Sequence, residues 1–561
     1  MRSNLLEKIP LVLFLILLVV FSVSIFKNIA YPLLWQDEAE TAIGATRVLT
    51  YGYPKSNDGK NTLNLLELDD KSLAIKEPYD AYITSSWSQF YVAAIGVKLS
   101  SFVSDIYTKT ALIRIPFALI GLVGILLCAQ VAKNIFGGRS QWLFYSGYVF
   151  LCMLSISLTL HIREVRYYSL TILLSGATLW LYTVFRHNQS TLSRRNFVTY
   201  TLVLVTLLIT TLATFPPLFF ILILTLGIAE VWHLFFKTHN KPLTIKDHLL
   251  HTLPLALTLI LSIPVFLFFE ILPLANALSE FMGFNMHLYW FNFSRTISFL
   301  FTYEFLGLFI VAKLAAGVTN HYRNNRDHAL RLSHFLTLYL TVYILFIART
   351  PYLFERYLMA LIPILNLVIV IDFFTVTRAI QHMTSKKLQS DILFVSIPLF
   401  IVMFAISLIP KLPHISGHLY ELTHQYKGPV DYAVEYINDT FPDPSQLVIA
   451  TNYEELSYEF YLGSKVTIGY VGNNLLEDST IQPDIIIMRK NRDNFVDTFK
   501  MLLSKDSYTG VNFEIDDYDF NNIPELYLAK PHRYQTTFAK DDNNKLSIYV
   551  RTAILPNPVS R

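Results

Sequence analysis

The chain has 561 residues, of which 53% are hydrophobic and 16% charged, and its formal net charge is +3. This composition is too apolar for an ordinary soluble globular protein. The Lys and Arg residues fall in short clusters between apolar segments, so the small positive charge does not indicate nucleic-acid binding. The two cysteines, Cys128 and Cys152, lie inside apolar segments and support neither a disulfide framework nor a zinc site. The sequence therefore indicates a polytopic membrane protein.

The first apolar run covers residues 9–26 and follows Arg2 and Lys8, a charge pattern that a signal peptide would share. The residues after it, Lys27-Asn28-Ile29-Ala30, lack the small-x-small pattern of a cleavage site. We therefore expect a retained membrane anchor.

A polar region from about residue 30 to 86 follows the anchor and is too long for a plain connector. The next apolar stretch, residues 87–103, carries Gln89 and Lys98. Such an amphipathic segment favours a helix at the membrane interface over one that crosses the bilayer. We expect residues 30–112 to form one outer loop that contains interfacial helices.

About 20 apolar residues are needed to span a bilayer, and ten further segments are suitable. They lie near residues 113–133, 142–161, 165–185, 197–214, 217–236, 249–269, 296–314, 332–348, 357–376 and 391–410. With the anchor, the sequence predicts eleven spans. The predicted fold class is an α-helical polytopic membrane domain, residues 1–412, with a soluble C-terminal α/β domain.

Loop charges orient the predicted spans. If the N-terminus is cytoplasmic and residues 87–103 stay on the surface, every strongly basic short loop becomes cytoplasmic, as the positive-inside rule requires. These loops lie near residues 133–139, 186–195, 237–246, 313–331 and 378–387. We therefore predict a multi-pass protein of a cell membrane, such as a bacterial inner membrane, with everything after residue 410 outside.

The C-terminal domain, residues 413–561, shows alternating helix and strand patterns. Helices are predicted at 430–441, 453–462 and 491–503, and strands at 447–451, 465–470, 484–488, 511–515 and 546–551. This alternation predicts a small extracytoplasmic α/β layer. The domain has no Gly-x-Gly-x-x-Gly and no Gly-Lys-Ser/Thr loop, so we expect no nucleotide site.

Two acidic residues follow the anchor in the sequence Trp35-Gln36-Asp37-Glu38-Ala39. A carboxylate is costly in hydrocarbon but not at the interface, where it meets water, a metal ion or a lipid head group. Asp37 and Glu38 are therefore candidate catalytic residues for a lipid-linked substrate, and Glu38 is also a candidate metal ligand. The alternative is an ordinary solvated loop.

A first arginine turn on the predicted outer side is Arg163-Glu-Val-Arg166, whose two guanidinium groups share a face if the segment is helical. Arginine offers a planar fork of donors suited to phosphate. In the alternative interpretation, Glu164 neutralises an arginine, and Tyr167 and Tyr168 belong to an interfacial aromatic belt.

A second turn, residues 349–357, carries Arg349, Glu355, Arg356 and Tyr357. Flanking charges prefer the cytoplasmic side, so arginines outside indicate a phosphate or carboxylate partner. In another predicted outer loop, residues 270–295, the stretch 285–293 supplies aromatic side chains suited to stacking on a sugar ring or to lying in the interface, and His287 is a weak candidate metal ligand. The predicted substrate-binding residues are Arg163, Glu164, Arg166, Tyr167, Arg349, Arg356 and Tyr357.

In their order and predicted topology, these motifs resemble the C-type glycosyltransferase superfamily of membrane enzymes. The similar segments are Trp-x-Asp-Glu-Ala after the first span, Arg114-Ile-Pro-Phe-Ala-Leu-Ile-Gly, the turn Arg-x-x-Arg-Tyr-Tyr-Ser-Leu, and Arg356-Tyr-Leu-Met-Ala-Leu-Ile-Pro. The resemblance is greatest to protein O-mannosyltransferases, aminoarabinose transferases and related bacterial membrane glycosyltransferases. It covers residues 1–410, whereas the C-terminal domain is similar only in kind.

The resemblance implies transfer of a sugar from a polyprenyl-phosphate donor to a glycan, lipid or protein acceptor on the outer face, with inversion at the anomeric carbon. It implies that Asp37 is the general base and that arginines bind the phosphate. A divalent metal cofactor is left open. Many relatives have an Asp after the Arg of the segment that corresponds to the first arginine turn, whereas this chain has Tyr167 there and its acid is Glu164.

Rival functions are compatible with parts of this pattern. A lipid-linked glycan ligase or polymerase would also place arginines and acids outside. A lipid-glycan transporter or flippase should show repeats and charged or broken helices near the bilayer midplane, whereas the predicted span interiors are almost without ionisable residues. A structural scaffold gives no reason for outer arginines.

Overall fold

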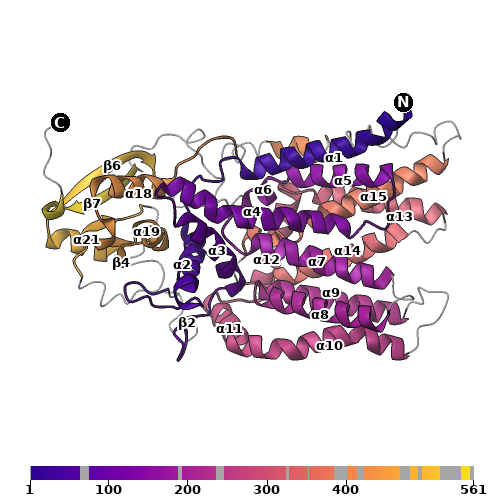
Figure 1. Cartoon of the computed structure of the whole chain (residues 1–561), viewed down its shortest axis with the longest axis horizontal. Helices are drawn as coiled ribbons and strands as arrows, with labels where there is room; N and C mark the ends of the chain where they lie inside the picture. The colour runs from indigo at the N-terminus through magenta and orange to yellow at the C-terminus, as the bar shows by residue number, and fades with distance from the viewer. Residues whose placement is uncertain are drawn as a thin grey trace.

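The structure is a computed structural model. It describes residues 2–63, 75–187, 193–235, 245–323, 328–351, 353–383, 402, 405, 407–412, 422–467, 481–490, 496–517 and 545–555. In this part of the chain a bundle of long helices carries a small sheet domain at one end, and the N-terminus lies at the other end (Figure 1).

Six of the described helices are long and apolar enough to cross a membrane, or up to eight spans if each of two bent pairs counts as one. The six lie within α1 (Arg2–Phe26), α4 (Ile106–Gln130), α7 (Tyr168–His187), α8 (Arg194–Leu212), α14 (His328–Ile347) and α15 (Ile362–Met383). The chain is thus a multi-pass membrane protein. The count is below eleven partly because most of the predicted span 391–410 lies outside the described residues, and because the apolar part of α9 (Pro216–Phe235) is short.

The predicted single span 142–161 is divided into α5 (Arg139–Leu154) and α6 (Ile156–His161). Ser155 separates them in an extended conformation, and its hydroxyl accepts the Leu158 N–H as the N-cap of α6. The Ser155 hydroxyl also donates to the buried Glu304 at 2.8 Å. Hydropathy could not reveal this break, because it averages over neighbouring residues and does not report a contact with a residue far along the chain.

The predicted outer loop at 270–295 contains helices, and the predicted span at 296–314 is interrupted by a bend. Helix α10 (Ile245–Phe268) bends by 61° into α11 (Ile271–Phe281), and α12 (Met286–Thr302) bends by 84° into α13 (Leu306–Arg323). Asn285 caps α12 by accepting the Leu288 N–H at 3.0 Å. At the second bend, Ser155 and Ser157 hold the carboxylate of Glu304 at 2.8 and 2.5 Å.

The segment predicted to form the first outer loop contains α2 (Gln36–Tyr51), α3 (Trp87–Ser100) and a short antiparallel pair, β1 (Ile75–Lys76) with β2 (Ala81–Tyr82). With 14 residues, α3 is too short to cross a bilayer. Helices α2 and α3 lie between the bundle and the C-terminal domain (Figure 1).

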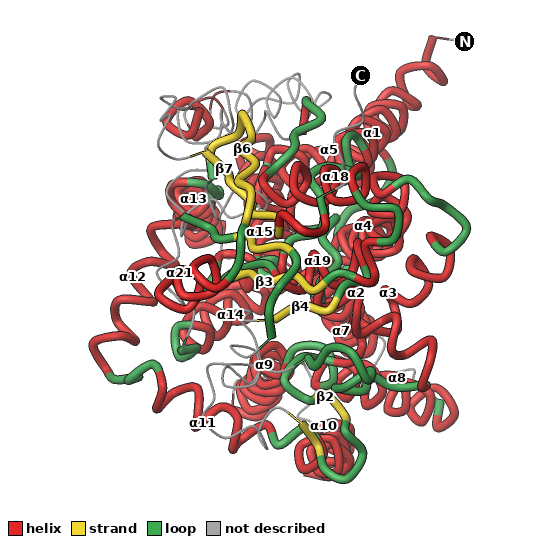
Figure 2. Tube along the Cα trace, turned by 90° about the vertical axis from the view of Figure 1, so that its left-hand side faces the viewer, coloured by secondary structure: helices red, strands yellow, loops and turns green. Residues whose placement is uncertain are grey.

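The C-terminal domain has a five-stranded mixed sheet in the order β4-β3-β5-β7-β6, with β3 parallel to β4 and β5, and β7 antiparallel to β5 and β6. Its elements are α18 (Pro429–Thr440), β3 (Val448–Thr451), α19 (Glu455–Leu462), β4 (Lys465–Thr467), β5 (Ile485–Ile487), α21 (Val496–Lys505), β6 (Tyr508–Asp516) and β7 (Lys545–Arg551). Every helix and strand predicted for this domain is present, with shifted ends. In the view of Figure 2, the domain lies in front of the ends of the bundle helices, with α19 beside α2.

Candidate functional site

Asp37 lies in the first turn of α2, directly beyond the α1 anchor, where the positive end of the helix dipole favours a carboxylate. Its side chain is 24% exposed. Arg356 donates through Nη2 to Asp37 Oδ2 at 3.1 Å, and Nη2 of Arg166 lies 3.7 Å from the same oxygen. The fold therefore brings Asp37 together with two arginines, Arg166 from the first predicted outer turn and Arg356 from the second.

Arg166 also contacts a second acid of α2. Its Nη1 donates to the main-chain oxygen of Asp37 at 3.1 Å, to Oε2 of Glu40 at 3.2 Å and to Oγ1 of Thr41 at 3.3 Å. Burial raises the pKa of Glu40, and the Arg166 charge opposes that rise. Glu40 was not singled out in the sequence, although its position one helical turn after Asp37 places it near the same guanidinium.

Aromatic rings surround the buried guanidinium of Arg356, which belongs to a 3-10 helix, Glu355–Leu358. Its central carbon lies 4.0 Å from the ring centre of Phe354 and 4.9 Å from that of Trp35. Contacts of this kind favour a guanidinium over the flexible ammonium of lysine. The two ring contacts therefore restrain the Arg356 guanidinium in its position beside Asp37.

The two adjacent tyrosines of the first turn have different environments. Tyr167 stacks on Phe215 with ring centres 5.0 Å apart, and the Tyr357 ring lies 5.5 Å from Phe215. Tyr168 is fully buried, and its hydroxyl has no hydrogen-bond partner in the described residues. The sequence predicted Tyr167 as the site residue and offered no signal that distinguishes it from Tyr168.

Glu38 points away from this cluster and is fully buried. Arg114 of α4 binds it with two hydrogen bonds of 2.9 and 2.5 Å, and the Val165 N–H donates to Oε1 at 2.9 Å. Arg114 also donates to the carbonyls of Ile29 and Pro32. The carboxylate predicted to be catalytic or metal-binding thus joins α2, α4 and the first turn. Arg114 belongs to a motif quoted from the sequence, but nothing there indicated its partner.

The segment 162–167 is a turn and not a helix, so the condition under which Arg163 and Arg166 would share a helical face is not met. Arg163 donates to the main-chain oxygen of Lys27 at 3.1 Å. Glu164 forms a hydrogen bond with buried His161. Of this turn, the structure brings only Arg166 to Asp37 by a direct contact between charged side chains.

Two predicted residues are exposed and make no described contact with Asp37. Arg349 follows the end of α14, and His287 lies in the first turn of α12. In the part of the chain that the structure describes, no group of three or more His, Cys, Asp or Glu side chains could hold a metal ion.

No family model and no curated protein sequence matches this chain. Two crystal structures of ArnT from Cupriavidus metallidurans match its fold. The apo structure has a TM-score of 0.51 at 12% identity over 96% of this chain and 97% of ArnT. The structure bound to undecaprenyl phosphate has a TM-score of 0.52 at 12% identity over 98% of this chain and 99% of ArnT. The fold of this chain is therefore similar to that of ArnT over nearly the whole length of both proteins.

Proposed function

We propose that this protein transfers a sugar from a polyprenyl-phosphate donor to an acceptor on the extracytoplasmic face, with inversion at the anomeric carbon. The observation that carries this proposal is the meeting of Asp37, Arg166 and Arg356 beside the first span. The ArnT structure that contains undecaprenyl phosphate supports a lipid phosphate as the donor class.

In this proposal Arg166 and Arg356 bind the donor phosphate. A guanidinium carries five N–H donors in a planar fork, enough to serve a carboxylate on one edge and a phosphate on another. The buried Tyr168 hydroxyl, which follows Tyr167 and Arg166 in the chain and has no hydrogen-bond partner in the described residues, is a further donor for that phosphate. When the bond between the anomeric carbon and the phosphate oxygen breaks, the phosphate keeps the electron pair, and these groups stabilise the added charge.

Asp37 acts as the general base. It accepts the proton of the acceptor hydroxyl while the hydroxyl oxygen bonds to the anomeric carbon on the face opposite the phosphate. Asp37 suits this role better than its neighbours, because it is partly exposed whereas Glu38 is enclosed by Arg114. Glu40 shares Arg166 with Asp37, so an incoming phosphate competes with Glu40 for that cation.

The test compares, by mass spectrometry, the glycolipids and glycoproteins of cells that make the protein, lack it, or make only Asp37→Asn. We expect one glycan modification to be lost both without the protein and in the variant. Transfer of a preassembled oligosaccharide would instead indicate a ligase or polymerase. A polyprenyl-linked sugar that changes membrane side without any covalent product would indicate a flippase and contradict the proposal.

A further inference from the structure

The segment that leads into Asp37 is held by side chains of the C-terminal domain. The N–H of Leu34 donates to the Tyr461 hydroxyl at 3.0 Å, and its carbonyl accepts from Ser457 Oγ at 2.8 Å. The N–H of Leu33 donates to Asp431 Oδ1 at 3.1 Å. Because all these groups are buried, losing one partner would leave a backbone group unpaired.

The first residue of α2 is bound in the same way. Gln36 donates through Nε2 to Glu455 Oε1 at 2.6 Å and accepts the Leu456 N–H at 3.3 Å. Trp35, the N-cap residue of α2, makes no side-chain capping bond. The start of α2, and with it Asp37, is therefore fixed by contacts from the domain and not by a cap in its own sequence.

An aromatic contact extends the connection to the second arginine. Trp35 packs with Tyr453 of the C-terminal domain in a small buried cluster. The same indole lies 4.9 Å from the guanidinium carbon of Arg356. The C-terminal domain thus contacts the residues that precede Asp37, and one of these, Trp35, also packs against Arg356.

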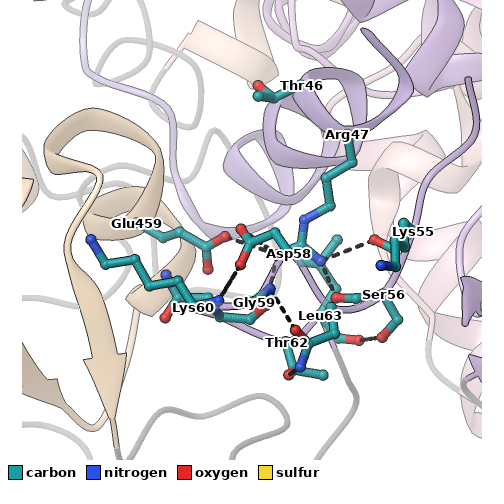
Figure 3. Close-up of polar contacts among 12 residues, drawn as sticks. Thr46, Arg47, Lys55, Ser56, Asp58, Gly59, Lys60, Thr62, Leu63 and Glu459 are labelled. Carbon is teal, nitrogen blue, oxygen red and sulfur yellow. Dashed lines mark hydrogen bonds and ion pairs between the residues drawn. The ribbon is translucent and has the colours of Figure 1, made fainter. Parts of the chain in front are cut away.

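A separate attachment joins the domain to the first outer segment farther along the chain (Figure 3). Arg47 binds Asp58 at 3.3 Å and Glu459 at 3.1 Å, and Lys60 donates to the Gly463 carbonyl at 2.7 Å. Next to Lys60, Asn61 donates to the Ser464 carbonyl at 2.9 Å and accepts the Val466 N–H at 3.0 Å. This attachment makes no described contact with residues 33–37, so it supplies a control.

We propose that the C-terminal domain is part of the catalytic centre, in which Glu455, Ser457 and Tyr461 are positioning residues that hold Asp37 where the acceptor hydroxyl is deprotonated. This inference rests on the proposed function for its catalytic consequence. The hold on residues 33–36 rests only on the contacts described above. A domain with no part in catalysis would not need to form hydrogen bonds with the backbone groups of residues 33 and 34, close to the base.

The experiment uses the full-length protein in lipid nanodiscs and compares two variants. Tyr461→Phe with Ser457→Ala removes both hydrogen bonds to Leu34, and Asn61→Ala removes two hydrogen bonds at the other attachment. The first readout is amide hydrogen exchange of residues 30–41, which needs no substrate. The second is turnover together with affinity for undecaprenyl phosphate.

We expect the double variant to exchange faster at residues 33–41 and to lose up to about 10²-fold in turnover, since a small misplacement of a catalytic group has effects of that order. Its affinity for undecaprenyl phosphate should change much less. Asn61→Ala should retain the parent's exchange at residues 33–41 and its turnover. If the double variant does not insert, Ser457→Ala alone tests the same contact.

Unchanged exchange at residues 33–41, or equal loss of turnover in both variants, would overturn the inference. Faster exchange with unchanged turnover would also overturn it, because the domain would then hold the segment without positioning the base. A parent protein that transfers no sugar would instead refute the proposed function, and hydrogen exchange would still decide whether the domain holds residues 33–36.

Discussion

At the scale of single residues, two adjacent acids occupy opposite environments. Successive side chains on an α-helix point about 100° apart. Asp37 therefore faces Arg166 and Arg356, whereas Glu38 faces Arg114 in the protein interior. One helical turn later, Glu40 returns to the side of Asp37. Their positions on the helix thus separate the proposed chemical role of Asp37 from the structural role of Glu38.

Asp37→Asn keeps the shape of the side chain and removes its ability to accept a proton. We expect turnover to fall by about 10² to 10⁴-fold, with affinity for undecaprenyl phosphate little changed. Transfer assays and a binding titration measure the two quantities. Near-parental turnover at saturating donor and acceptor would show that Asp37 is not the base.

Glu38→Gln should act mainly on stability. Arg114 would keep its charge in a buried site without a carboxylate, and breaking such a pair costs about 3 to 5 kcal/mol. We expect a clear fall in the thermal unfolding midpoint, with activity retained below it. An unchanged midpoint with weaker acceptor binding would instead support the direct role predicted from the sequence.

Tyr168→Phe separates stability from binding. Among the described residues, the buried Tyr168 hydroxyl has no hydrogen-bond partner, a condition that costs about 1 to 3 kcal/mol. We therefore expect an unchanged or higher unfolding midpoint together with weaker binding of undecaprenyl phosphate. Tyr148→Phe is the control, because its hydroxyl donates to the Ile125 carbonyl at 3.2 Å and lies outside the site. Unaltered binding in Tyr168→Phe would remove this hydroxyl from the phosphate site.

At the scale of elements, polar side chains buried between helices set the bundle geometry. Glu304, Ser155 and Ser157 meet where α12 bends into α13. Elsewhere, Lys313 of α13 lies 3.5 Å from Asp372 of α15. Such contacts link helices that hydropathy treats as independent segments.

Lys313→Met should destabilise the bundle, because Asp372 is fully buried and would lose its cation. The expected cost is about 3 to 5 kcal/mol, whereas the double variant Lys313→Met with Asp372→Leu should recover most of it. Thermal unfolding in detergent measures both. Equal losses in the single and double variants would mean that the pair is not the cause.

At the scale of the whole molecule, α2 is one of the helices that join the bundle to the C-terminal domain, together with α4, whose Tyr107 binds Asp431. Residues 33–36 bind the domain at one end of α2, and Arg47 binds Glu459 of the domain near the other. The N-terminus and the domain lie at opposite ends of the bundle (Figure 1). This arrangement agrees with the predicted placement of the two on opposite sides of the membrane, which stays a prediction.

The Glu459 contact should make the connection between α2 and the domain sensitive to pH. Burial raises the pKa of Glu459 to about 7, and Arg47 opposes the rise. The folded protein then binds the proton more tightly than the unfolded chain, so this group's contribution to stability is complete below pH 4.5 and is lost as pH rises through about 7. Hydrogen exchange of residues 55–63 between pH 5 and 8, with temperature and intrinsic rates matched, should show this loosening. Glu459→Gln should abolish it, and an identical pH profile in the variant would contradict the assignment.

The sequence by itself determined the membrane class, most span positions and the α-helices and strands described in the C-terminal domain, because apolar runs and hydrophobic periodicity are local properties of the chain. It also selected Asp37, Arg166 and Arg356 as candidates through their residue types and predicted side of the membrane. Only the tertiary structure decided which of the candidates meet. Arg166 and Arg356 lie 129 and 319 positions from Asp37 along the chain, and no local pattern encodes a contact at that separation. The same holds for the partner of Glu38, the bend at Glu304 and the contacts of the C-terminal domain with residues 33–36, since each depends on the packing of side chains from distant segments.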